Sequence, residues 1–268
     1  MAVSIHPTAQ VSPKAELGDN VTIGHCAVVE DNVIIGEGSC VEAFASVKSY
    51  TRMGKNNTIH SYAMVGGIPQ DLKFYGEESW LEMGDGNSVR EFATLHRGTE
   101  GGGGITRIGS NNLFMAYTHI AHDCQMGSNI IMSNAATLAG HVTVEDGCIL
   151  GGLSAIHQFS RIGTCAFVGG MSGIAMDVPP YMLASGHRAD LHGPNLVGLR
   201  RKQVSREILA AVRAAYRLIW LSGIPRKEAL DQAEQEFATT PEVQTIVAFV
   251  RASERGVLPA SSKEGSAE

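Results

Sequence analysis

The chain has 268 residues, which is enough for one large domain and a small one. Its formal net charge of −6 argues against a general nucleic-acid-binding protein, and no apolar run approaches the roughly 20 residues that a membrane-spanning helix needs. Aromatic residues make up only 6% of the chain, whereas there are 31 glycines, which favours thin, repetitive packing by aliphatic side chains.

The N-terminal stretch and the cysteines bear on the cellular compartment. The first ten residues, MAVSIHPTAQ, have neither a positively charged region nor an apolar core, so we expect no signal peptide. The five cysteines form no CxxC pair. An odd number of cysteines without framework spacing favours a reducing cytoplasm.

A six-residue repeat begins at Ile5. An aliphatic residue or Met returns at every sixth position up to Val65, and the fourth residue after it is usually small. The repeat resumes over residues 83–95 and, after a phase slip, over residues 108–174. A period of six fits neither an α-helix nor plain strand alternation, but it suits short strands joined by tight turns around a solenoid. The sequence therefore predicts a mainly β fold, with a parallel β-helix over residues 1–188.

Two segments, residues 69–80 and 98–105, break the repeat. Interruptions of a solenoid usually form loops on one face, often the binding face, so we expect two excursions from the β-helix here. The second excursion contains four consecutive glycines, residues 101–104. It lacks the Lys-Ser/Thr pair and the following helix of a phosphate-binding loop, and we interpret it as a flexible loop.

The C-terminal part of the chain has a different pattern. Residues 205–222 carry apolar side chains at helical spacing, residues 226–239 form a second amphipathic stretch, and a third begins at Pro241, a residue favoured in the first turn of a helix. We predict a small α-helical domain over residues 189–258. Residues 259–268 are expected to form a disordered tail.

Four histidines are expected to gather on one face of the β-helix. Residues eighteen apart should lie on adjacent coils, roughly 4.8 Å apart. This places His122, His141 and His157 on three successive coils, with His119 at the corner beside them. Three interpretations remain open at this point: polar surface residues, a metal site with His119 and His122 as ligands, or a general base at His122 that Asp123 orients.

Seven short motifs, spread in order over nearly the whole chain, carry a specific family resemblance. They are QDLKFYGE (70–77), LHRGT (95–99), HIAHDC (119–124), ATLAGHV (136–142), IHQF (156–159), DVPPY (177–181) and GLRRK (198–202). Together they resemble the UDP-N-acetylglucosamine O-acyltransferase family.

The resemblance implies a fold and a reaction. The β-helix would be left-handed. The enzyme would transfer an (R)-3-hydroxyacyl group from acyl carrier protein to the 3-hydroxyl of UDP-N-acetylglucosamine, the first step of lipid A biosynthesis. It would be a cytoplasmic homotrimer with clefts between its chains, and it would need no metal and no cofactor.

The resemblance also implies residue roles. His122 would be the general base, Asp123 would hold its other ring nitrogen, and the backbone N–H of Gly140 would stabilise the oxyanion. Gly170 would lie at the end of the acyl groove and permit a long chain. The substrate-binding residues would be Gln70, Asp71, Lys73, His119, His141, His157, Gln158, Asn195, Arg201 and Lys202.

The chain departs from the family pattern near the expected nucleotide contacts. Lys202 stands where the family often has Arg, which replaces a bidentate fork by a point charge. Val197 stands where the family can carry Glu. Basic residues cluster where the helical domain begins, and they are candidates for binding the acidic carrier protein: Arg200, Arg201, Lys202 and Arg206.

Other protein classes share some of these features. The N-acyltransferase that acts later in the same pathway carries a uridine-binding domain before its repeats, whereas the repeats here begin at Ile5. A coenzyme A-dependent acetyltransferase of a small molecule generally lacks the long helical segment. A zinc enzyme such as the γ-type carbonic anhydrase would use the histidines as ligands. A purely structural solenoid has no use for clustered histidines and two excursions.

Overall fold

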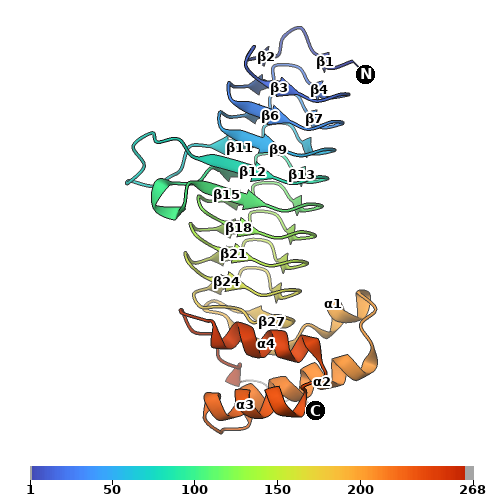
Figure 1. Ribbon diagram of the computed structural model, residues 1–268, viewed down its shortest axis with the longest axis vertical. Coiled ribbons are helices and arrows are strands. Elements are labelled where there is room, and N and C mark those ends of the chain that lie inside the picture. Colours follow the sequence, from blue (N-terminus) through green and yellow to red (C-terminus); the bar gives the residue numbers. More distant parts are fainter. Residues whose placement is uncertain (1, 263–268) are drawn as a thin grey trace.

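The computed structural model describes residues 2–262. Figure 1 shows a long prism of stacked coils, with the N-terminus at one end and four helices packed at the other. Two excursions leave the prism on one side. The architecture is therefore a β-helix, as the six-residue repeat predicted, followed by a small helical domain, as the helical spacing of the C-terminal residues predicted.

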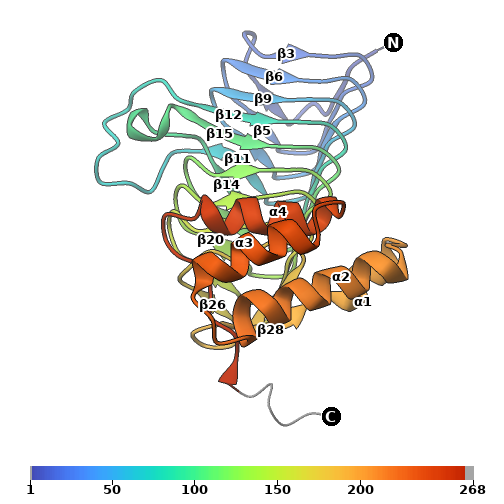
Figure 2. The same cartoon turned by 60° about the horizontal axis from the view of Figure 1, so that its bottom comes forward.

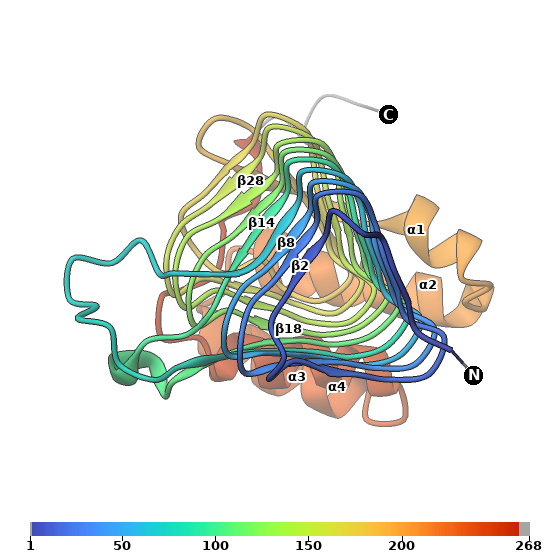
Figure 3. The same cartoon turned by 90° about the horizontal axis from the view of Figure 1, so that it is seen from above.

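Three parallel sheets form the faces of the prism. Residues eighteen apart pair in register, as Ile5 does with Ile23 and His119 with Thr137. Viewed from the N-terminal end in Figure 3, the chain passes anticlockwise from the first to the second and third faces as it recedes. The β-helix is therefore left-handed.

Neighbouring strands of a face are three strands apart in the chain, except for the last two strands of the first sheet. The first sheet has eleven strands: β1 (Ser4–Ile5), β4 (Thr22–Ile23), β7 (Cys40–Val41), β10 (Thr58–Ile59), β13 (Ser88–Val89), β16 (Leu113–Phe114), β19 (Ile131–Met132), β22 (Ile149–Leu150), β25 (Phe167–Val168), β27 (Met182–Ser185) and β28 (Asp190–Pro194). The second sheet has nine: β2 (Gln10–Val11), β5 (Val28–Val29), β8 (Ser46–Val47), β11 (Met64–Gly67), β14 (Thr94–His96), β17 (His119–Ile120), β20 (Thr137–Leu138), β23 (Ala155–Ile156) and β26 (Gly173–Ile174). The third has eight: β3 (Glu16–Leu17), β6 (Val33–Ile35), β9 (Thr51–Met53), β12 (Trp80–Met83), β15 (Ile105–Ile108), β18 (Gln125–Met126), β21 (Thr143–Val144) and β24 (Arg161–Ile162).

The aliphatic residue of each hexad fills the interior of the prism. Ile59, Leu95 and Ile120 are fully buried, and each comes from a different coil. Burial is incomplete at the open N-terminal end, where the side chain of Ile5 is 46% exposed because only one neighbouring coil covers it.

A ladder of buried asparagines runs through the middle coils. The Asn57 carboxamide oxygen accepts hydrogen bonds from the backbone and side-chain nitrogens of Asn87 at 2.9 and 3.0 Å. The Asn87 oxygen accepts from the backbone N–H of Asn112 at 3.0 Å, and the Asn112 oxygen accepts from that of Ile130 at 2.8 Å. These side chains satisfy corner N–H groups that the strand ladder leaves free, so their removal would leave buried donors without partners.

The two excursions are close to the predicted segments. The first connects β11 to β12 and the second connects β14 to β15, so Trp80 and Ile105 begin strands and are not loop residues. The glycine run of the second excursion is ordered by a 3-10 helical turn, η1 (Glu100–Gly102), and the carbonyl of Gly104 accepts a 2.7 Å hydrogen bond from the N–H of Trp80. The end of the second excursion is thus hydrogen-bonded to the start of β12, the strand that follows the first excursion.

The helical domain packs beside the C-terminal coils (Figure 2). Its helices are α1 (Leu196–Arg201), α2 (Arg206–Tyr216), which continues as a π-helical turn η2 (Arg217–Leu221), α3 (Arg226–Glu236) and α4 (Pro241–Arg251). Ser205 caps α2, as its side-chain oxygen accepts a hydrogen bond from the N–H of Ile208 at 3.3 Å. No helix of the described residues is long and apolar enough to cross a membrane.

Two predicted boundaries were wrong. Residues 189–194 are not helical, because β28 folds back antiparallel on β27 and extends the first sheet. The expected disordered tail was wrong for its first residues: Leu191 in β28 donates to the carbonyl of Pro259 and accepts from the N–H of Ser261, both at 2.8 Å. The free edge of β28 provides hydrogen-bonding partners for the residues around Pro259, and their polar composition alone did not predict this pairing. Residues 263–268 lie outside the described part of the chain.

We expect Asn87→Ala to lower the free energy of unfolding by about 2–4 kcal/mol, because it removes one member of the ladder and leaves buried polar groups without partners. Urea denaturation followed by circular dichroism measures this change. Asn129→Ala is the matched control, since Asn129 is exposed and outside the ladder; it is expected to cost about 1 kcal/mol or less. Equal losses for the two variants would contradict the role of the ladder.

Candidate active site

The histidine cluster centres on His122 and His141. His122 lies two residues after β17, at the corner between the second and third faces, and His141 lies at the same corner on the next coil. Their rings are perpendicular with centroids 5.1 Å apart, and His141 in turn stacks on Phe159 with centroids 4.5 Å apart. The coil geometry therefore brings together two of the predicted histidines.

Asp123 fixes the orientation of the His122 ring. Its side chain is almost fully buried, and its Oδ2 lies 2.7 Å from Nδ1 of His122. Burial alone would raise the pKa of Asp123, but hydrogen bonds from His122 and Thr99 outweigh it and lower the pKa below its ordinary value. A carboxylate can only accept, so Nδ1 of His122 carries the proton in this pair, and Nε2 is left as the ring's acceptor.

The second excursion secures this carboxylate. Thr99 donates its backbone N–H to Oδ1 of Asp123 at 2.8 Å and its hydroxyl to Oδ2 at 2.7 Å. A side chain at Gly102 would collide with the same carboxylate, so this member of the glycine run leaves the space that Asp123 occupies. Sequence reasoning missed Thr99, although it belongs to the motif LHRGT, whose family resemblance was a usable signal.

Gly140 lies against the ring of His122. A methyl group built on Gly140 would be 2.6 Å from Cε1 and 2.8 Å from Nε2 of His122, closer than real contacts allow. No hydrogen bond within the described residues uses the N–H of Gly140. A free backbone donor therefore lies beside the accepting nitrogen of a histidine, which is the arrangement that acyl transfer through an oxyanion needs.

His96 and His119 form a second, more deeply buried pair. Their rings are perpendicular with centroids 4.8 Å apart, and Nδ1 of His119 is 2.8 Å from the hydroxyl of Thr94. Burial lowers the pKa of His96 to about 4, with the nearby rings of His119 and His122 acting in the same direction, and burial likewise lowers the pKa of His119. Both rings are thus neutral near pH 7. His96 also belongs to LHRGT and was missed.

The metal site that the sequence left open used His119 and His122 as ligands, and this choice of ligands was wrong. Nδ1 of His119 lies 2.8 Å from the Thr94 hydroxyl, and His119 is not part of the group of possible ligands that the described residues form around His122. The group with ligand atoms within 4.8 Å of one another is His122, Asp123 and His141. In that group the Oδ2 of Asp123 already accepts from His122 and Thr99, which is the pattern of a hydrogen-bonded base.

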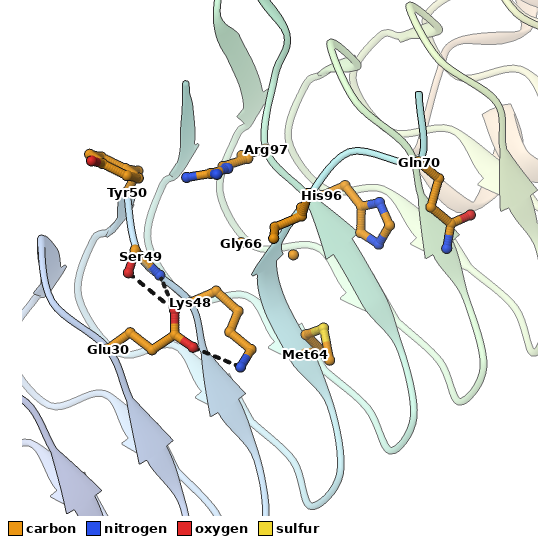
Figure 4. Close-up of a pocket in the computed structure, with 11 residues that line it drawn as sticks. Glu30, Lys48, Ser49, Tyr50, Met64, Gly66, Gln70, His96 and Arg97 are labelled. Carbon is orange, nitrogen blue, oxygen red and sulfur yellow. Dashed lines mark hydrogen bonds and ion pairs between the residues drawn. The ribbon is translucent and has the colours of Figure 1, made fainter. Parts of the chain in front are cut away.

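Two cavities adjoin these histidines. One, of 610 Å³, lies between the excursions and the coil surface and is lined by Asp71, Lys73, Tyr75, Gly76, Glu77, Thr99, Glu100, Gly101, His141 and Phe159. The other, of 530 Å³, lies at the foot of the first excursion (Figure 4). Gln70 and His96 line the second cavity, while Asp71 and Lys73 line the first. The first excursion therefore lines both cavities beside the histidines.

The remaining predicted residues are not joined to this cluster within one chain. His157 and Gln158 are exposed, and Nδ1 of His157 meets only the carbonyl of Gln158, at 3.0 Å. Asn195 caps α1 and donates to the carbonyl of Cys165 at 3.1 Å, while the amine of Lys202 lies 3.1 Å from Sγ of Cys165. Figure 3 shows α1 and the excursions on opposite sides of the prism. Two groups of predicted residues thus face different directions.

Comparison with known proteins decides the family. The model of domain 2 of UDP-N-acetylglucosamine O-acyltransferase matches residues 177–258, and the bacterial transferase hexapeptide model matches residues 14–49. The structure of LpxA from Acinetobacter baumannii is 43% identical, covers 95% of this chain and 99% of its own, and superposes with a TM-score of 0.92. This chain belongs to the UDP-N-acetylglucosamine O-acyltransferase family.

Other solved members of the family are similarly close. The UDP-N-acetylglucosamine acyltransferase of Francisella novicida is 34% identical over 96% of this chain and 95% of its own, with a TM-score of 0.92. The Arabidopsis enzyme is 36% identical over 95% of this chain and 99% of its own, with a TM-score of 0.85. The similarity spans both the β-helix and the helical domain, so this acyltransferase shares its overall fold with these relatives.

The buried His96 is expected to titrate near pH 4 instead of at its ordinary value of 6.5. Because the unfolded chain then binds a proton that the folded chain does not, stability falls as the pH drops from about 6.5 to about 4, and it is unaffected above that window. Nuclear magnetic resonance of the ring Cε1–H, assigned with His96→Gln, measures the midpoint. A midpoint above about pH 6 would contradict the burial argument. His96→Gln should also weaken the acid dependence of stability.

Proposed function

We propose that this acyltransferase transfers an (R)-3-hydroxyacyl group from acyl carrier protein to the 3-hydroxyl of UDP-N-acetylglucosamine, the first step of lipid A biosynthesis. One observation carries the proposal: His122 is held by Asp123 at 2.7 Å, with its other nitrogen free beside the unused N–H of Gly140. The relatives are named as acyltransferases of this nucleotide sugar.

The proposed reaction follows from these groups. Nε2 of His122 takes the proton of the sugar 3-hydroxyl as its oxygen attacks the thioester carbonyl, and Asp123 stabilises the imidazolium that results. The N–H of Gly140 donates to the oxyanion of the tetrahedral intermediate. The carbon–sulfur bond then breaks, the ester remains on the sugar, and the leaving thiolate takes the proton back from His122. Since the thioester is already activated, neither a covalent enzyme intermediate nor a metal is required.

The substrate residues are proposed on the two surfaces beside this centre. Gln70, Asp71 and Lys73 of the first excursion would hold the sugar and the acyl donor, with His119, His141, His157 and Gln158 along the same cleft. Asn195, Arg201 and Lys202 would meet the nucleotide. The 610 Å³ cavity, whose lining includes Asp71, Lys73 and His141, supports the first part of this assignment.

A homotrimer is proposed because one chain leaves the predicted residues on opposite sides of the prism. A neighbouring chain could bring its Asn195 and Lys202 to the cleft beside His122. The prism also carries an aromatic stripe along one corner: Phe44, Tyr62, Phe92 and Tyr117, which stack at 5.0–5.1 Å and are 43–61% exposed. An exposed apolar stripe of this length favours burial against another chain. Sedimentation equilibrium should give three times the 28.5 kDa chain mass; a monomer at micromolar concentration would refute the trimer.

Acyl carrier protein is proposed as the donor because the helical domain carries a basic groove. Arg200, Arg206 and Arg213 line it, and none of them forms an ion pair within the described residues. Carrier proteins are acidic, so this groove suits them better than it suits free coenzyme A. A cytoplasmic location is consistent with the donor and with five cysteines that are all free.

His122→Ala is expected to lower kcat by about 10²–10⁴, because the base acts in the transition state. Initial rates with UDP-N-acetylglucosamine and 3-hydroxyacyl carrier protein measure the change, and a chelator should leave the parent rate unaltered. His192→Ala, at an exposed histidine in β28, is the matched control and should retain full activity. If His122→Ala kept more than about a tenth of the rate, another group would have to be the base.

Gly170 is proposed to admit a long acyl chain. It is exposed, and a methyl group built there would lie 3.3 Å from the carbonyl oxygen of Gly152, so a larger residue requires a shift of a few tenths of an ångström in that backbone. Gly170→Met should shift the preference to shorter 3-hydroxyacyl chains by roughly fourfold per methylene, with Gly170→Ala in between. Product masses from a panel of 3-hydroxyacyl carrier proteins test both this role and the reaction itself. An unchanged chain-length profile would reject the role of Gly170 alone, whereas no acylated sugar from the parent would reject the function.

A further inference from the structure

The buried, positively charged side chain of Arg97 lines the 530 Å³ cavity at the foot of the first excursion (Figure 4). Eleven residues line it: Glu30, Lys48, Ser49, Tyr50, Met64, Gly66, Gly67, Ile68, Gln70, His96 and Arg97. The side chains come from four successive coils of the second face and from the chain that leaves it. None of the roles proposed above uses Arg97, Lys48 or Glu30.

Arg97 is buried and has no anionic partner. The residue is only 8% exposed, yet its guanidinium forms no hydrogen bond and no ion pair within the described residues, and its Nε is fully buried without a partner. Its guanidinium carbon lies 5.0 Å from the ring centre of Tyr50 and 5.3 Å from that of Phe74. Such contacts compensate only in part for a buried charge, which normally requires an acceptor.

The carboxylate of this cavity is already engaged. Glu30 accepts from the amine of Lys48 at 2.8 Å and from the N–H and hydroxyl of Ser49 at 3.0 and 3.1 Å. These hydrogen bonds, together with the Lys48 charge, overcome the effect of burial and lower the pKa of Glu30, which is therefore ionised. Because Glu30 neutralises Lys48, the charge of Arg97 is left over. The cavity has a net positive charge and unused donors.

A second unused nitrogen lines the same cavity. Nδ1 of His96 is buried and has no hydrogen-bond partner in the described structure. Gln70 also lines this cavity, on the other side of His96 from Arg97 in Figure 4. Unpaired buried donors are rare unless a ligand or water satisfies them. The unpaired guanidinium donors of Arg97 therefore point to an occupant with acceptor oxygens, and the neutral ring of His96 offers such an occupant one N–H at most.

We propose that this cavity binds a phosphate group through Arg97, at a site that adjoins the proposed acyl-transfer cleft and shares Gln70 with it. A guanidinium offers planar paired donors that match the oxygens of a phosphate better than any other side chain does. The volume exceeds that of a free ion, and Met64, Ile68 and Tyr50 provide apolar surface, so a phosphate ester of a small organic molecule fits the site. Its occupant would lie beside Gln70 and His96.

The test is calorimetric titration of the full-length parent protein with inorganic phosphate and with phenyl phosphate, at constant ionic strength. Saturable binding is expected for both, with phenyl phosphate tighter. Arg97→Met keeps the side-chain stem and should weaken binding about tenfold or more. Arg52→Met is the matched control, because Arg52 is exposed over Trp80 and pairs with Glu82; it should bind as the parent does.

Misfolding of Arg97→Met could also weaken binding, so a second variant is chosen that should strengthen it. Glu30→Gln removes the only carboxylate among the lining residues and should tighten binding severalfold, since it relieves repulsion of the anion. Equal binding by the parent, Arg97→Met and Glu30→Gln would overturn the site, as would the absence of saturable binding by the parent. Loss of binding in Arg52→Met to the same degree would also overturn it, because the effect would then reflect overall surface charge. Equal affinity for the two ligands would reject the ester and retain the phosphate site.

Discussion

The structure depends on the register between coils. Each strand pairs in parallel with the strand of the next coil, normally eighteen residues on, and every inward aliphatic residue then lies on its counterpart. Where the chain is longer, as between Thr58 and Ser88, the pairing is kept and the surplus residues leave the prism. The excursions are thus a consequence of conserving the ladder, since a shift of register would expose the interior residues.

The excursions convert a repetitive surface into a site. A coil corner by itself presents His122 and Asp123 much as it presents any other pair of residues. Thr99, from the second excursion, donates twice to Asp123 and stabilises its charge in a buried position. Gly102 leaves room for that carboxylate, and Gly140 leaves room for the ring it holds. The site therefore combines one histidine–carboxylate pair with the absence of two side-chain obstructions, the Cβ atoms that Gly102 and Gly140 lack.

Two kinds of buried charge lie within a short distance in this region. Asp123 accepts hydrogen bonds from Thr99 and His122, and its anionic form fits the role of orienting a base. Arg97, two residues before Thr99, is buried with no comparable partner. Asp123 thus has its hydrogen-bonding partners within the chain, whereas the Nε of Arg97 has none among the described residues.

The sequence by itself determined the β-helix, the two excursions, the helical end and the family, because a six-residue period and its interruptions are properties of local order. It also predicted that His119, His122, His141 and His157 gather on one face, and of these the structure joins His122 to His141 but leaves His157 apart. Only the tertiary structure decided that His119 pairs with His96, that Thr99 holds Asp123 and that Arg97 lacks a partner. These contacts depend on how the excursions fold back on the prism, and the sequences of the excursions do not follow the six-residue repeat. The strand β28 and its pairing with Pro259 and Ser261 were equally hidden, because a free sheet edge exists only once the coils have formed.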